Sequence, residues 1–187
     1  MQPSTFIIQQ SLFIILRNHL TFNFKSDCMN KEELVIKMVI AEWQKQNARL
    51  DKLLETLSEE QLKAETAPGR NSGIYLVGHL AAVNDGMLPL LGFGEKLHPE
   101  LANIFLTNPD KSSLSRPSLD ELKNYWKEIN AKLSQHINEL KPEEWFTRHT
   151  AVSEEDFAKE PHRNKLNIII NRTNHQSYHL GQLAYLK

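Results

Sequence analysis

The last stretch of the sequence carries two histidines that could bind a metal ion. His175 and His179 lie four positions apart in the run NHQSYHLGQLAYL, residues 174–186. Four residues make just over one helical turn, so both imidazoles would leave the same face of a helix. Two interpretations are open. The pair is either two amphipathic residues on a helix flank or two metal ligands that need a third.

The candidate for that third ligand is His79, in the run GIYLVGHLAAVND. It lies among apolar residues, so it is either a hydrogen-bonded core histidine or a ligand. Three neutral imidazoles from two helices would hold a divalent transition metal and leave a coordination position for water or substrate. Such a donor set suits zinc, nickel, copper or iron. We therefore take His79, His175 and His179 as the candidate metal ligands.

Three further polar residues could orient those ligands, because a metal-bound histidine normally donates its other ring N–H to an acceptor. Gln182 lies three positions after His179, and Asn171 lies four positions before His175. Asn47 interrupts an otherwise apolar seam and either points into the site or is solvated. Gly181 indicates a close approach of two helices.

The other titratable residues carry no predicted chemistry. Asp85 is rotated off the face that carries His79 and is not expected to be a ligand. The single cysteine, Cys28, excludes a disulfide within the chain and a thiolate metal site of its own. The reacting group is therefore unknown and would be a water or an external thiol. The remaining histidines are expected to be solvated (His98, His149, His162), to be a hydrogen-bonded core residue (His136), or to lie in the N-terminal extension (His19).

Four long amphipathic helices are predicted to position these residues. Apolar residues recur at three- and four-residue steps, and strand-like alternation is scarce. Ser72 is a candidate helix cap, and Ser118 with Glu121 forms a capping box. The prediction is an all-α fold, a four-helix bundle with long connections at 92–117 and 141–163. The expected helices cover residues 32–57, 73–91, 119–140 and 165–187.

Composition limits the classes of partner. The chain has 187 residues, with 22 basic and 23 acidic residues interspersed, so no basic stripe predicts nucleic-acid binding. Residues 1–29 contain two short apolar bursts that precede their basic residues, which is typical of neither a signal peptide nor a membrane helix. We expect residues 1–29 to be a dispensable extension or the product of a wrongly chosen start, with membrane targeting as the competing interpretation. The domain is then 30–187, cytoplasmic, with a small-molecule substrate and no membrane partner.

Two segments together resemble a known family. LSEEQLKAETAPGRNSGIYLVGHLAAVND, followed far downstream by HQSYHLGQLAYL, resembles the DinB/YfiT-like superfamily of metalloproteins. The matching features are an apolar helix with one histidine and a terminal helix with H-x3-H-x-G-Q, and the resemblance covers about residues 31–187. It implies a four-helix bundle, often dimeric, in which zinc or nickel is bound by His79, His175 and His179.

The same resemblance implies a reaction. Some members resemble thiol S-transferases that use bacillithiol or mycothiol, so a metal-dependent transfer of a low-molecular-weight thiol to a small electrophile is the leading hypothesis. A bound divalent metal can deprotonate a thiol or lower the pKa of water to about 7, so a hydrolase is equally open. The sequence is also compatible with a non-catalytic stress-response protein that binds a metal or small ligand, and with a purely structural helical protein. Because ligating histidines must be neutral, metal affinity should fall below about pH 6.

Overall fold

The computed structural model describes residues 30–187, of which Lys31–Lys187 form one compact unit. The predictions for residues 1–29, including those for His19 and Cys28, fall outside the described part. Helices are the regular secondary structure of residues 30–187, and the β-structure there is limited to two isolated bridges, Glu65 with Ser72 and Arg148 with Asn164. The predicted all-α class is therefore confirmed.

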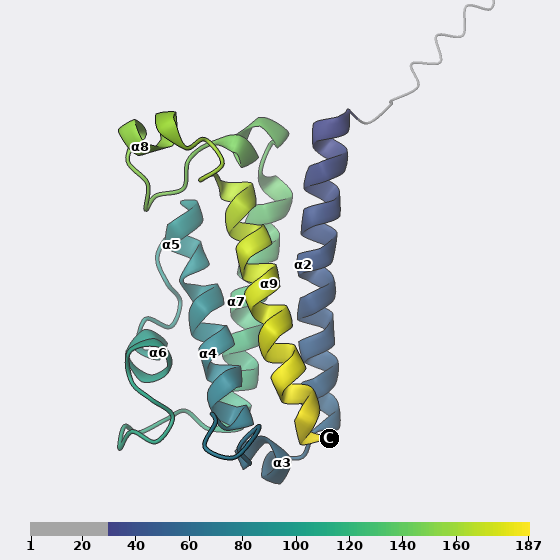
Figure 1. Cartoon of the computed structure of the whole chain (residues 1–187), viewed down its shortest axis with the longest axis vertical. Coiled ribbons are helices and arrows are strands. Elements are labelled where there is room, and N and C mark those ends of the chain that lie inside the picture. The colour runs from purple at the N-terminus through teal and green to yellow at the C-terminus, as the bar shows by residue number, and fades with distance from the viewer. Residues whose placement is uncertain (1–29) are drawn as a thin grey trace, which may run out of the picture. The chain divides into compact units, whose positions relative to one another are not determined.

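The long helical segments are α2 (Lys31–Thr56), α4 (Gly73–Asp85) continued by α5 (Met87–Leu91), α7 (Leu119–Glu139) and α9 (Lys165–Leu183). They lie side by side (Figure 1). Helix α2 packs on α9, α9 packs on α4, and α4 packs on α7. Helices α7 and α2 are joined by Trp126, whose indole N–H donates to Asp51 Oδ1 at 2.8 Å. These contacts fit an all-α fold, and the exact four-helix bundle stays a prediction.

The second predicted helix is broken at Gly86, between α4 and α5. Pro89 explains the break, because proline has no N–H to donate to the carbonyl of Asp85, four residues earlier. By length and composition the combined stretch Gly73–Leu91 would be able to cross a membrane, but 67% of its apolar window is buried within the protein. A mostly buried core helix passes the same test of length and composition.

Helix starts follow the capping signals in the sequence. Ser72 accepts from the Tyr75 backbone N–H, and Ser118 forms the predicted capping box with Glu121. Asn164 caps α9 by accepting from the Asn167 N–H at 3.0 Å. Short elements fill the connections: α3 Glu59–Lys63, α6 Glu100–Ala102, the π-helix η1 Asn103–Thr107, the 3-10 helix η2 Pro142–Phe146, α8 Glu154–Lys159 and the 3-10 helix η3 Ala184–Leu186.

The connection between α5 and α7 is held firmly over α4. The buried carboxylate of Asp85 accepts the backbone N–H groups of Leu97 at 2.8 Å and of His98 at 3.0 Å. Further along, the Phe105 ring packs so closely on Gly78 that a Cβ there would lie 2.4 Å from it. Elements α6 and η1 therefore pack against the helix that carries His79.

Candidate metal centre

Three histidines from two helices converge in the structure. His79 comes from α4, and His175 and His179 come from α9. The Nε2 atom of His175 lies 3.2 Å from Nε2 of His79 and 3.1 Å from Nε2 of His179. Two nitrogens that each bind a tetrahedral metal at 2.0–2.1 Å are roughly 3.3 Å apart. The spacing of these nitrogens therefore fits a shared metal ion.

The second ring nitrogens of two of these histidines are fixed by acceptors. His79 Nδ1–H donates to the Phe105 carbonyl at 3.0 Å, and His179 Nδ1–H donates to Gln182 Oε1 at 2.7 Å. A neutral imidazole carries one proton, so the Nε2 atoms of His79 and His179 present lone pairs. These two Nε2 atoms are the ones that lie close to Nε2 of His175.

Hydrogen bonding among the three rings does not account for the cluster by itself. With its proton on Nε2, His175 donates to either His79 or His179, but not to both. The other of these two histidines would then lie with its Nε2 lone pair little more than 3 Å from Nε2 of His175 and without a hydrogen to accept. A cation between the three nitrogens removes this conflict, so the donor set fits a metal.

The surroundings keep these imidazoles uncharged. Burial lowers the pKa of His175 to about 4, with additional contributions from the nearby His179, His79 and Arg172. Burial also lowers the pKa of His179, against the opposing effect of its hydrogen bond to Gln182. Both rings are therefore in the neutral form that binds metal at physiological pH.

The three residues predicted to orient the ligands have different positions. Gln182 makes the contact with His179 that its spacing suggests. Asn171 is exposed. It lies four residues before His175, and a four-residue step rotates a position by about 40° around the helix axis, which turns Asn171 towards solvent. Asn47 is buried, but it lines a hollow of about 310 Å³ with Trp126 on α7. No described hydrogen bond joins Asn171 or Asn47 to the cluster.

Several other expectations need correction. A Cβ at Gly181 would meet no atom within 4 Å, so the prediction of a close helix approach there is wrong and Gly78 has that role instead. His98 is not solvated, because it stacks on Tyr125 at 3.9 Å between ring centroids and lies 3.1 Å from Glu128. His136 stacks on Phe93, and its Nε2 has no hydrogen-bond partner among the described residues.

Two features of the site were not anticipated. The acceptor for His79 is a backbone carbonyl of the π-helix η1, which also accepts from the Tyr75 hydroxyl at 3.2 Å. Arg172, one turn before His175, contributes a charge that acts on that histidine. In the sequence, the only signal for the contact between η1 and His79 was the long connection at 92–117. The only signal for the effect of Arg172 on His175 was their three-residue spacing.

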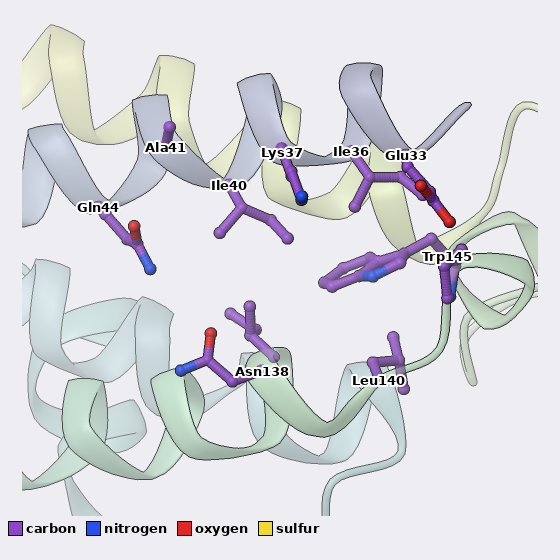
Figure 2. A pocket seen from close by; sticks show the side chains of 11 residues that line it. Glu33, Ile36, Lys37, Ile40, Ala41, Gln44, Asn138, Leu140 and Trp145 are labelled. Atoms are coloured by element: carbon purple, nitrogen blue, oxygen red, sulfur yellow. The ribbon is translucent and has the colours of Figure 1, made fainter. Parts of the chain in front are cut away.

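A separate hollow lies between α2, α7 and η2 (Figure 2). It has a volume of about 510 Å³, and its lining includes Ile36, Ile40 and Trp145. None of the three clustered histidines lines it. It is therefore distinct from the candidate metal centre.

Comparison with known protein families gives a match over most of the chain. The family model described as DinB superfamily matches residues 42–183, a range that includes all three clustered histidines. No curated protein matches the chain.

Proposed function

The chain belongs to the DinB superfamily, and we propose that it binds one divalent transition metal, zinc or nickel, through His79, His175 and His179. The observation that carries this proposal is the convergence of one ring nitrogen from each histidine, all within 4.8 Å of one another. We further propose that the metalloprotein transfers a low-molecular-weight thiol to small electrophiles. A cytoplasmic homodimer is the setting in which we expect it to act.

The chemistry of the surroundings favours thiol transfer over hydrolysis. Metal-dependent hydrolysis usually needs a general base within reach of the attacking water. In residues 30–187 no aspartate or glutamate joins the histidine cluster, and no carboxylate is among the groups that shift the pKa of His175 or His179. A divalent metal, when bound, deprotonates a coordinated thiol without such a base.

The thiol must come from outside the domain, because the only cysteine in the sequence, Cys28, precedes residue 30. In the proposed reaction the thiol sulfur forms a bond to an electrophilic carbon of the substrate. The bond from that carbon to its leaving group breaks, and the leaving group departs with the electron pair. The thiol proton passes to solvent. A small thiol cofactor is therefore part of the proposal.

The protein's own contribution is to hold the ligands in place. The Phe105 carbonyl and the Gln182 side chain fix the rings of His79 and His179 with their Nε2 lone pairs directed at one point. Elements α6 and η1 pack on α4, and η1 supplies the carbonyl that holds His79. Preorganised ligands of this kind lose little freedom when a metal binds.

A turnover assay tests the transferase. Untagged protein would be loaded separately with zinc and with nickel and incubated with chlorodinitrobenzene and bacillithiol, mycothiol or glutathione. We expect metal-dependent formation of the thioether with at least one thiol, and none above background with the His175→Ala/His179→Ala variant. Equal rates in the two proteins, or no product with any loaded sample, would contradict thiol transfer and leave metal binding as the function.

A further inference from the structure

Arg172 is a partly buried cation, and no carboxylate among residues 30–187 forms an ion pair with it. Its Nε is buried and has no hydrogen-bond partner, and the ion pairs among the described residues all involve other side chains. Burial lowers the pKa of this guanidinium, and no neighbouring carboxylate opposes the shift. Buried arginines are normally paired, because desolvating an unpaired charge is costly.

The position of Arg172 relates it to the histidine cluster. It precedes His175 by three residues on α9, so the two side chains are neighbours on the helix surface. Arg172, His175 and His179 stand at i, i+3 and i+7 on α9, so the arginine shares the helix face that carries the two ligands.

Within residues 30–187, a second buried nitrogen on this helix face is also without a hydrogen-bond partner. Nδ1 of His175 is buried and has no hydrogen-bond partner, unlike Nδ1 of His79 and of His179. If Nε2 of His175 binds metal, Nδ1 must carry the ring proton. Such an N–H usually donates to a carboxylate, a carbonyl or a water. This side of the cluster therefore offers unpaired donors and positive charge, and the described residues supply no acceptor.

We propose that Arg172 binds the carboxylate of a small substrate or cofactor whose other end reaches the metal. This inference rests on the metal site proposed above. The planar guanidinium pairs with a carboxylate through two parallel hydrogen bonds, a geometry that lysine cannot reproduce. One helical turn, about 5 Å, separates Arg172 from His175. A thiol with a two- or three-carbon spacer to a carboxylate spans such a distance.

Ligand discrimination tests the proposal. Protein reconstituted with cobalt(II) would be titrated with 3-mercaptopropionate and with 2-mercaptoethanol, and binding would be followed by the thiolate-to-cobalt absorption. The parent should bind the mercaptocarboxylate about tenfold or more tightly than the neutral thiol, the range expected for a charge-assisted bidentate pair. Arg172→Met should remove this preference, and Arg172→Lys should restore part of it.

Matched variants separate charge recognition from a general effect. Arg163→Met removes the same charge from a side chain that is paired with Glu160 at 3.1 Å, and it should keep the preference. If the parent and Arg172→Met both bind cobalt and show the same ratio of affinities for the two thiols, the proposed role of Arg172 is wrong. The proposed metal site would still stand. No cobalt bound by the parent would overturn the proposed metal site and this inference together.

Discussion

His79 on α4 and His175 on α9 bring their Nε2 atoms to 3.2 Å although 96 positions separate them in the chain. The packing of α4 on α9 creates this contact, and each helix presents its histidine from the side that faces the other. Two helices that pack in this way can hold a metal only if the imidazole rings are also oriented. Substitutions can test that orientation, the surrounding packing and the electrostatics separately.

Removing the acceptor for His179 should weaken metal binding. Gln182→Leu deletes the oxygen that lies 2.7 Å from Nδ1 of His179 and leaves that N–H without a partner. Loss of such an acceptor typically costs 10- to 100-fold in metal affinity, and we expect a decrease in this range by competition with a chromophoric chelator. Gln182→Glu should bind at least as tightly as the parent. The control Asn171→Leu, at an exposed site on the same helix, should leave the affinity unchanged.

Gly78 on α4 and Gly181 on α9 should respond in opposite ways to alanine. At Gly78 a Cβ would lie 2.4 Å from the Phe105 ring, so Gly78→Ala must displace the residue whose carbonyl orients His79. We expect it to destabilise the protein by about 1–3 kcal/mol and to weaken metal binding as well. Urea unfolding and the chelator competition would measure the two effects.

Gly181→Ala is the matched control for that substitution. A Cβ at Gly181 meets no atom within 4 Å, and alanine is the better helix former, so this variant should gain roughly 0.5–1 kcal/mol. If Gly181→Ala destabilises the protein as much as Gly78→Ala does, another element must pack closely on this end of α9.

The buried carboxylate of Asp85 should stabilise the connection that packs on α4. It accepts two backbone N–H groups, those of Leu97 and His98, and an asparagine can accept through only one oxygen. Asp85→Asn should therefore destabilise the protein by about 1–3 kcal/mol and increase hydrogen exchange at those two amides. Glu95→Gln, an exposed change in the same connection, is the control and should do neither.

The metal-free protein should lose stability in mild acid. The pKa of His175 is about 4 in the folded protein, below its ordinary value of 6.5, so the unfolded chain binds more protons between these values. Stability therefore falls as pH decreases from about 6.5 to about 4, and His179, whose pKa is also lowered, acts in the same direction. The sequence alone suggested that protons displace metal below about pH 6, and the lowered pKa of His175 moves that competition to lower pH.

Thermal melts of apoprotein across this pH range would measure the effect. His175→Gln should show a shallower decline, because it removes the group with the low pKa. A melting temperature that rises as pH falls from 6.5 to 4 would contradict the assigned direction.

The parts of the site that were predicted are those that the helical period determines. His175 and His179 share a face because of their spacing, and Ser72 and Ser118 mark helix starts by their side-chain chemistry. The acceptor for His79 could not be predicted in this way. It is the main-chain carbonyl of Phe105, a group that every residue carries, and only the path of the connection brings it to the ring.

Other features depend on packing that no single segment determines. An arginine at position 172 is ordinary in sequence, and only the folded chain shows that no acidic side chain of residues 30–187 pairs with it. Gly78 and Gly181 look alike in sequence, yet only Gly78 is covered by the Phe105 ring. Asn47 was correctly seen as a break in the apolar seam, but the seam position that it occupies faces α7 and not the histidines.

Metal content is the most direct test of the central claim. Untagged protein and the His175→Ala/His179→Ala variant would be purified side by side and analysed by elemental mass spectrometry, before and after reconstitution with zinc and nickel. We expect about one equivalent of a transition metal in the parent and almost none in the variant, with the helical circular dichroism of both preserved. Equal metal content in the two proteins, or no metal in the parent after reconstitution, would contradict the proposed three-histidine site.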